Sequence, residues 1–444
     1  MKLKILGHSS VFIEFCGKNI LVDPCLEDDF IGIFRRFPDL GELDFQLPNP
    51  DILFITHHHW DVVCIRSLSK LDKKVRVLIP ENQQLVKILD QLKFENVQIL
   101  SPWQKIEIES GYLLAIPSEV SFGELGFLLH DKYSTFLNLA DNRINESIIN
   151  KINTSCPKID LTFAPYQSYD EMAILKKENS KISSNFIKEQ ALLVSKLNSK
   201  VILPFKDGLY YPNIDYLNKK AFLYSPYYFI DLLKEQNYKI QSEILIPLDE
   251  ITISNDGVDI KRDDYFTKND LLNLYEVYRV FDSSVSFEKE EKKRIYSKLD
   301  LSMVEDYLLE DFYRHLSPKI KKQCRLECVI FTIDIIDSDF VYEIDFVTKK
   351  ECFISSKKMN KTCVFSICYL DLIDLIEREQ LLSILIQTDR VQLLGSNEQM
   401  KYRALDIMFD GGFNDAINLF AYIENILKKS MISYFTDEQK RLEC

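Results

Sequence analysis

Three of the chain's six histidines lie in one segment, Thr56-His57-His58-His59-Trp60-Asp61, directly after the apolar run at residues 52–55. This pattern is typical of a buried strand that delivers polar residues to a loop. Where a strand passes into a loop, side chains two residues apart tend to point the same way, so we expect His57, His59 and Asp61 to converge. Two imidazoles and a carboxylate suit zinc or iron. The segment therefore predicts a metal site, and a metal-free, hydrogen-bonded cluster is the alternative.

The elements that must position this segment read as a mixture of strands and helices. β-branched and aromatic runs separated by Gly17-Lys18-Asn19 predict a hairpin near the N-terminus. Alternating short apolar runs and longer helical patterns continue to about residue 250, and a polar run at residues 261–270 looks like a linker. We therefore expect a layered α/β domain over residues 1–255 and a smaller α+β domain over residues 265–444.

Composition narrows the class of protein. The 444 residues are 46% hydrophobic and 28% charged, which is ordinary for a globular protein. The formal charge of -13 disfavours a nucleic-acid partner, because phosphate backbones demand a basic face. No apolar run approaches the roughly 18–20 residues of a membrane span. Ten cysteines without C-x-x-C spacing, and an N-terminus without a signal-peptide pattern, predict a cytoplasmic protein with reduced thiols.

The histidine segment resembles the H-x-H-x-D-H signature of the metallo-β-lactamase superfamily. Two other stretches support the resemblance in the expected order. Gly7-His8-Ser9-Ser10-Val11 with Ile20-Leu21-Val22-Asp23-Pro24 is similar to the superfamily's opening hairpin, and the stretch at 136–141 is similar to its strand before a bridging aspartate, here Asp141. The resemblance implies an αββα sandwich for the first domain and a metal-ligand role for Asp141.

A nearer resemblance is to the branch that includes CMP-N-acetylneuraminate hydroxylase. Four stretches carry it, at residues 124–142, 160–166, 200–205 with Asn218, and 340–346 continuing through 370–409. The resemblance spans most of the chain and implies a metal-dependent oxygenase or hydrolase. Its substrate would be a small anionic molecule such as a sugar nucleotide or a sugar acid.

The chain also departs from these families. Val62 stands where the superfamily has its last motif histidine, Ser118 and Glu119 stand where hydrolytic members have a further histidine, and Lys206 lies near their final one. No C-x-H with C-x-x-H pair occurs, so a Rieske iron–sulfur domain is absent. An oxygenase of this type would then take its electrons from another protein.

One or two iron or zinc ions fit the remaining ligands. We expect His57 and His59, with Glu119 or Glu124, to hold one ion. We expect Asp61 and Asp141 to bridge to a second ion. A set of two histidines and a carboxylate suits non-haem Fe(II) and O₂ chemistry. A Zn²⁺ in the same place would lower the pKa of bound water and support hydrolysis, with Asp61 as general base. The sequence leaves both chemistries open, together with a third reading, a degenerate member that binds without turnover.

Three further residues have two interpretations each. His8 either lines the mouth of the site or is a hydrogen-bonded turn residue. Asp23 either orients a metal ligand or forms a turn before Pro24. Lys206 either contacts the anionic substrate or lies on the solvated surface. The sequence does not predict the oligomeric state.

Overall fold

The computed structural model describes residues 1–27, 29–30, 34–38, 40, 45, 47–120, 123–139, 141–166, 175, 184–205, 208–211, 218, 224–262, 270–272, 298–336, 338, 340–354, 362–387, 390–415 and 417–428. The chain divides into two compact units, Met1–Tyr169 with Ile182–Phe281, and Asp170–Lys181 with Asp282–Cys444. The linker predicted at 261–270 lies mostly outside the described residues, so the predicted limits 1–255 and 265–444 stay predictions.

The first unit contains two large sheets and a small one. The first large sheet has the order β17 (Gly257–Lys261), β16 (Glu250–Ser254), β1 (Lys2–Gly7), β2 (Ser10–Phe15), β3 (Lys18–Val22), β6 (Ile52–Phe54), β7 (Arg76–Pro80) and β8 (Asn96–Leu100). Strands β17 to β3 pair antiparallel, and β3, β6, β7 and β8 pair parallel. Parallel neighbours need crossover connections: α1 (Ile65–Ser69) lies in the one between β6 and β7, and α2 (Gln83–Gln91) in the one between β7 and β8.

The second large sheet has the order β14 (Ser199–Pro204), β13 (Ile159–Ala164), β12 (Thr135–Asn138), β11 (Leu125–His130), β10 (Gly111–Pro117) and β9 (Lys105–Ile108). Strands β9 to β12 form an antiparallel meander, whereas β12, β13 and β14 are parallel. The small sheet joins β15 (Leu209–Tyr210), β5 (Phe34–Arg36) and β4 (Asp29–Phe30).

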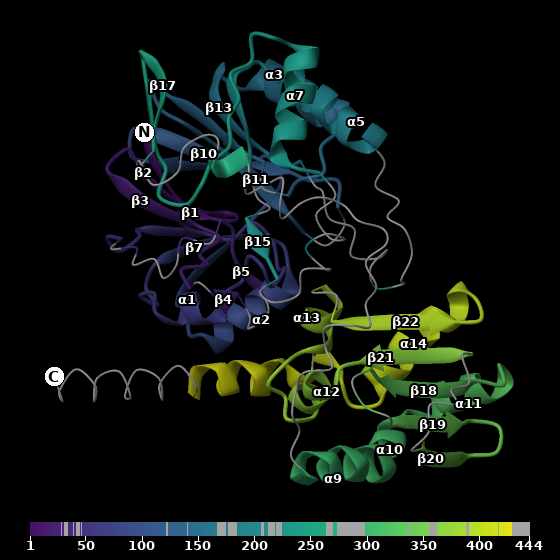
Figure 1. Ribbon diagram of the computed structural model, residues 1–444. Helices are drawn as coiled ribbons and strands as arrows, with labels where there is room; N and C mark the ends of the chain where they lie inside the picture. Colours follow the sequence, from purple (N-terminus) through teal and green to yellow (C-terminus); the bar gives the residue numbers. More distant parts are fainter. Residues whose placement is uncertain are drawn as a thin grey trace. The chain divides into compact units, whose positions relative to one another are not determined.

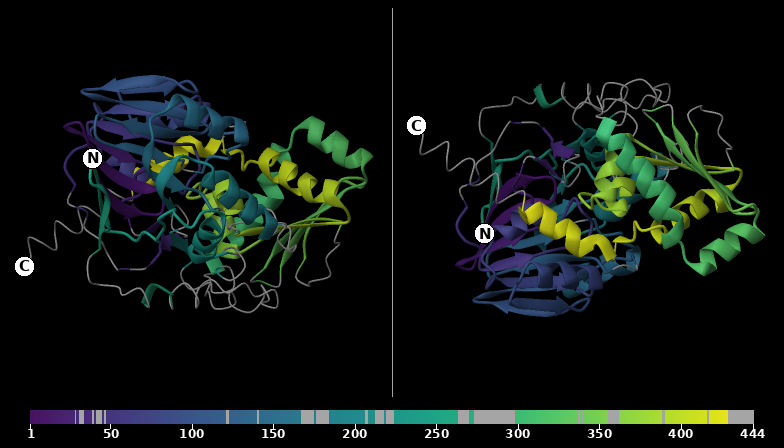
Figure 2. Two further views of the ribbon diagram at one scale, coloured as in Figure 1. Left: turned by 90° about the horizontal axis from the view of Figure 1, so that it is seen from above. Right: turned by 90° about the horizontal axis from the view of Figure 1, so that it is seen from below.

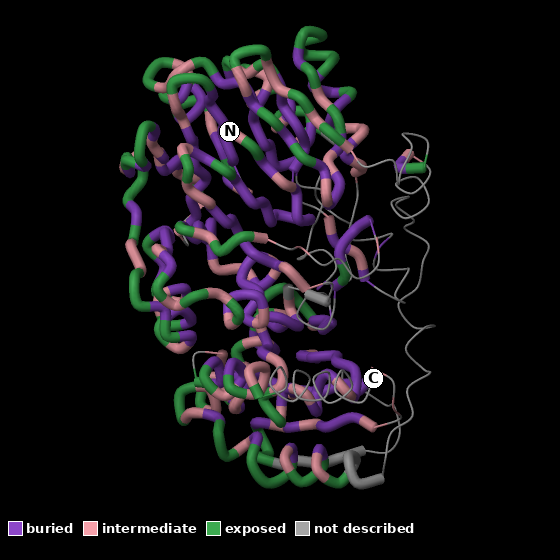
Figure 3. The backbone as a smooth tube through the Cα atoms, turned by 90° about the vertical axis from the view of Figure 1, so that its left-hand side faces the viewer, coloured by how far each residue is buried: buried purple, intermediate pink, exposed green. Residues whose placement is uncertain are grey.

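The two large sheets enclose one apolar core. It collects alternate residues of both sheets, for example Leu3 and Ile13 from the first sheet and Phe127 and Phe136 from the second, all buried. A separate apolar cluster joins the second sheet to α3 (Glu146–Ser155), α5 (Ser184–Ser195) and α7 (Pro226–Gln236). Figure 1 shows these three helices on one side of the strands and α1 and α2 on the other. The unit is the predicted αββα sandwich, and its buried strands form the purple centre of Figure 3.

Local signals explain where several helices begin. The side chains of Asn82, Asn145 and Ser225 accept backbone N–H groups at the starts of α2, α3 and α7. Pro226 occupies the first turn of α7, where its missing N–H costs no helical hydrogen bond. These caps set the direction of the helices that cover the sheets.

The second unit is a five-stranded sheet with helices. Its order is β20 (Lys350–Ile354), β19 (Val341–Asp345), β18 (Ile330–Ile335), β21 (Cys363–Ile367) and β22 (Val391–Gly395). Its helices include α9 (Lys298–Asp306), α11 (Pro318–Leu326), α12 (Tyr369–Ile376), α13 (Leu382–Gln387) and α14 (Glu398–Asp410). Phe312 packs against Phe331 and Tyr342 of the sheet, and Figure 2 shows this helical layer in green and yellow. The predicted α+β character is confirmed.

Within the described part of the chain, no helix is both long and apolar enough to cross a membrane. In the described part of the chain, the cysteines at positions 16, 25, 64, 156, 324, 328, 363 and 368 are thiols and form no disulfide.

Candidate metal centre

The histidine segment follows β6 after Ile55, and hydrogen bonds with the two sheets hold Ile55 and Thr56. The N–H of Ile55 donates to the carbonyl of Leu78 on β7, and the N–H of Leu125 on β11 donates to the carbonyl of Thr56 at 3.0 Å. Thr56 is fully buried. The loop therefore leaves the sandwich at a point that both sheets determine.

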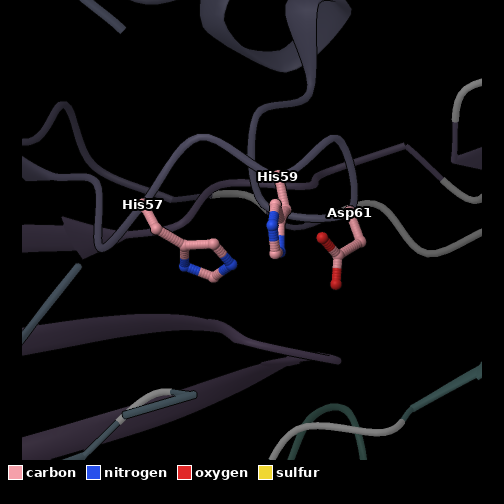
Figure 4. Close-up of side chains that lie close together, drawn as sticks. All are labelled: His57, His59 and Asp61. Carbon is pink, nitrogen blue, oxygen red and sulfur yellow. The ribbon is translucent and has the colours of Figure 1, made fainter. Parts of the chain in front are cut away.

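The loop brings together the three residues that the spacing selected. Donor atoms of His57, His59 and Asp61 all lie within 4.8 Å of one another. The two imidazole rings meet edge to face, with centroids 4.6 Å apart and an interplanar angle of 81°. Figure 4 shows the three side chains on the same side of the loop.

His57 also belongs to a second group of donors, from the other sheet. Its partners are Glu124, just before β11, and Asp141, which follows β12, and the three donor atoms again lie within 4.8 Å of one another. The Nε2 atom of His57 lies 3.5 Å from Oδ2 of Asp141, and its Nδ1 atom lies 3.7 Å from Oε1 of Glu124. His57 thus stands between a histidine–aspartate pair and a pair of carboxylates.

The hydrogen bond between Thr56 and His57 decides which nitrogen of His57 can bind a metal. A hydroxyl has one hydrogen. The Thr56 hydroxyl uses it toward Oδ2 of Asp23 at 2.7 Å, and the same oxygen lies 2.9 Å from Nδ1 of His57. Nδ1 must therefore carry the proton and donate it to Thr56. The lone pair is left on Nε2, the nitrogen that faces Asp141.

Asp23 accepts a second hydrogen bond, from the N–H of Thr56 at 2.8 Å, and it is 1% exposed. Its carboxylate thus orients His57 through Thr56. Thr56 is thus a candidate positioning residue, which the sequence pattern did not single out. A hydroxyl residue immediately before the first histidine was the signal that could have found it.

His8 lies against Asp61. Its Nε2 atom is 3.0 Å from Oδ2 of Asp61, and its side chain is 3% exposed whereas that of Asp61 is 23% exposed. His8 belongs to neither of the two donor groups. The structure therefore places it beside a candidate ligand.

Other sequence candidates lie elsewhere. Glu119 is exposed, belongs to neither donor group and accepts a hydrogen bond from the Asn145 amide. His58 turns away, and its Nδ1 atom lies 3.1 Å from the Asn82 amide; burial lowers the pKa of His58 despite the opposing effect of Asp61. Lys206 lies outside the described residues.

Val62, which replaces the motif histidine, is 1% exposed. Its N–H donates to the carbonyl of His59 at 3.1 Å, which closes a tight turn in the loop. An apolar side chain at this position provides no metal ligand. The carboxylates of the second donor group are the ligands that the described residues offer instead.

Comparison with known proteins agrees with this architecture. Residues 2–125 match the family model described as "Beta-lactamase superfamily domain". This stretch of the first unit is therefore similar to that family. The matched stretch contains His8, Asp23, the whole histidine loop and Glu124, and it ends before Asp141.

The chain is also similar to curated proteins and to solved structures. A putative Rieske 2Fe-2S iron-sulfur protein of Mycolicibacterium smegmatis is 25% identical over 179 residues, which cover 37% of this chain and 34% of that protein. A UPF0173 metal-dependent hydrolase of Saccharolobus solfataricus is 32% identical over 60 residues, 14% of this chain and 23% of that one. The chain thus spans about a third or less of these relatives. CmlA, a diiron β-hydroxylase from Streptomyces venezuelae, matches with a TM-score of 0.41 and 18% identity over 59% of this chain and 54% of its own.

The donor set fits a metal ion. Ligand atoms that are each about 2.1 Å from one ion lie roughly 3–3.5 Å apart. The separation of 3.5 Å between Nε2 of His57 and Oδ2 of Asp141 is of this size. Glu124 is 5% exposed, and a buried carboxylate needs a cation or hydrogen-bond donors beside it. The described imidazoles and carboxylates therefore fit as candidate ligands of a metal ion.

Proposed function

We propose that this chain is a metal-dependent enzyme whose centre is held by His57, His59, Asp61, Glu124 and Asp141. The observation that carries the proposal is that His57 belongs to two donor groups at once, one from its own loop and one from the opposite sheet. A surface cluster of acidic residues would not share a buried imidazole that is 1% exposed. The two groups also offer enough donors for one or two ions.

The composition of the donor set favours iron over zinc. Two imidazoles and three carboxylates make a set rich in oxygen donors, and two histidines with a carboxylate and open positions are typical of non-haem iron oxygenases. Bound iron would supply O₂ activation, whereas bound zinc would supply Lewis acidity for hydrolysis. We therefore propose an oxygenase first, and a hydrolase as the second candidate.

The protein's own residues have distinct parts in this proposal. Thr56 and Asp23 hold His57 in one tautomer. The side chains of Asp61 and Asp141 are 23% and 22% exposed, so they are better placed than buried Glu124 to accept a proton from a substrate or from water, and we assign this part to Asp61. In a hydrolase, Asp61 would be the general base.

The substrate and the electron source remain part of the proposal. We propose a small anionic substrate, in the class of sugar nucleotides or sugar acids, with Lys206 as its candidate contact. An oxygenase would receive two electrons per turnover from a separate protein. Nucleic acid is not proposed as a partner, because the chain is strongly acidic.

Reconstitution under anaerobic conditions tests the proposed chemistry. We expect the protein loaded with Fe(II) to consume O₂ with a chemical reductant faster than the same protein loaded with Zn(II). We expect Asp61→Asn to lower this rate or, in the zinc form, to lower esterase or phosphodiesterase activity toward small chromogenic substrates. A protein that holds metal and shows neither activity across these assays would favour the binding-protein reading and overturn the proposal.

A further inference from the structure

Asp61 reaches the proposed metal centre from an open loop, and a residue far away in the sequence holds its carboxylate. His8 lies in the turn between β1 and β2, and its Nε2 atom is 3.0 Å from Oδ2 of Asp61. The contact joins residues 53 positions apart. One carboxylate oxygen of Asp61 is thereby engaged by a residue of another element.

The turn that carries His8 is held in an unusual conformation. His8 has a φ of 49°, and the preceding Gly7 has a φ of 110°. A non-glycine residue in the left-handed region is uncommon, and it persists where the surroundings determine it. The strain at His8 therefore has to be offset by packing or hydrogen bonds around the turn.

Packing around the turn is close on two sides. A Cβ atom at Gly208 would lie 2.9 Å from the backbone nitrogen of His8, and one at Gly7 would lie 2.5 Å from Cδ of Arg36. Ser10 ties the other end of the turn to the loop of Asp23, because its Oγ atom donates to the Asp23 carbonyl and accepts from the N–H of Cys25 at 2.8 Å. The imidazole of His8 is thus delivered from a rigid support.

We propose that His8 is a positioning residue that fixes the carboxylate of Asp61 for its part in the metal centre. The inference rests on the proposed function above and adds a residue that is not itself in either donor group. Ligating carboxylates are typically hydrogen-bonded in turn, and loss of such a partner lowers metal affinity about 10–100-fold. Asp61 has 23% of its side chain exposed, so the buried imidazole of His8 holds it on the side away from solvent.

Variants at position 8 separate this role from a structural one. The side-chain amide of glutamine can reach about as far as Nε2 of histidine, whereas that of asparagine corresponds to Nδ1. Asparagine is, however, the better residue for a positive φ. If the bond to Asp61 matters, His8→Gln should retain most of the metal affinity, and both His8→Asn and His8→Leu should lose about 10–100-fold. If only the turn matters, His8→Asn should be the best of the three.

The experiment is a chelator competition with Zn²⁺ and with Fe²⁺ on the full chain, with His8→Leu also made in the Asp61→Asn background. We expect His8→Leu to weaken binding in the wild-type background and to change it little when Asp61 is already replaced. Equal losses in both backgrounds, or unchanged affinity in His8→Leu, would overturn the role of His8 while the metal centre stands. A wild-type protein that binds neither ion would overturn both proposals. Should His8→Leu fail to fold, the ranking of His8→Gln against His8→Asn gives the same decision.

Discussion

The hydroxyl of Thr56 donates its only hydrogen to Oδ2 of Asp23 over 2.7 Å. The same oxygen is 2.9 Å from Nδ1 of His57, so that ring must donate to Thr56 and keep its lone pair on Nε2. Asp23 thereby sets the tautomer of His57 through the Thr56 hydroxyl.

Replacement of Thr56 by valine should therefore weaken metal binding with little change in shape. Thr56→Val removes both hydrogen bonds, releases the His57 ring to either tautomer and leaves two buried polar atoms without their hydroxyl partner. We expect a loss of about 10–100-fold in metal affinity and a loss of about 1–3 kcal/mol in stability. Thr56→Ser keeps the hydroxyl and should retain most of both. Equal metal affinities for the valine and serine variants would show that the hydroxyl has no such role.

Two glutamates provide a matched pair for the ligand set. Glu124 is buried in a donor group with His57 and Asp141, whereas Glu119 is exposed and outside both groups. We expect Glu124→Gln to lower metal affinity at least about tenfold, since the amide keeps the shape but removes the charge that a cation needs beside it. Glu119→Gln should bind metal as the wild type does. Isothermal titration of each variant with metal measures the two affinities. A larger loss in Glu119→Gln than in Glu124→Gln would refute the assignment of Glu124 as a ligand.

The sequence predicted which residues belong to this site better than it predicted which of them would lie side by side. Because β3 and β6 are parallel and Val22 pairs with Phe54, Asp23 is carried to the side of Thr56. That register joins strands 30 residues apart in the chain, and no local pattern contains it. Asp23 could for the same reason be read as a turn former. The choice between Glu119 and Glu124 likewise depends on the bond between Leu125 and Thr56, which links the two sheets.

Some local signals were present but not used. Asn145 before α3, and Ser225 with Pro226 before α7, are cap residues of the kind that mark a helix start, yet neither helix was predicted. Strand β20 was also missed. The turn at residues 255–256 joins β16 to β17 and leads into Gly257, whose φ of 128° favours glycine.

His130 should make the first unit less stable in mild acid. Burial lowers the pKa of His130 below its ordinary value of 6.5, although Asp131 and Asp160 oppose the shift. The unfolded chain therefore binds a proton at this position more readily than the folded chain. The contribution of neutral His130 to the free energy of unfolding is complete above about pH 6.5 and is lost as the pH falls below that value. The contact of its Nδ1 atom with Oγ1 of Thr135, at 2.9 Å, would change on protonation.

The test of His130 is tryptophan-detected denaturation in the presence of a chelator, so that metal release does not contribute. Both tryptophans, Trp60 and Trp103, belong to the first unit. The loss of stability between pH 8 and pH 5 should be smaller in His130→Gln than in the wild type. An identical pH dependence in the two proteins would contradict the prediction.

The second unit contains a buried ion pair whose disruption should be costly. The guanidinium of Arg390 lies 2.8 Å from Oδ2 of Asp371, and the two side chains are 4% and 9% exposed. Asp371→Leu would leave the Arg390 charge buried without this partner, which costs about 3–5 kcal/mol. For comparison, Glu398→Gln removes the more exposed pair with Lys401 and should cost less than about 1 kcal/mol. Thermal unfolding followed by far-ultraviolet circular dichroism compares the two, and equal effects would contradict this ranking.

The most direct test of the account is the metal content of the protein purified without a histidine tag, measured by inductively coupled plasma mass spectrometry. We expect one or two iron or zinc ions per chain, and iron if the oxygenase proposal holds. The double variant His57→Ala/His59→Ala should contain none. His58→Gln, in the same loop but outside both donor groups, should keep the wild-type content. A metal-free wild type after growth with added iron and zinc, or an unchanged content in the double variant, would contradict the central claim.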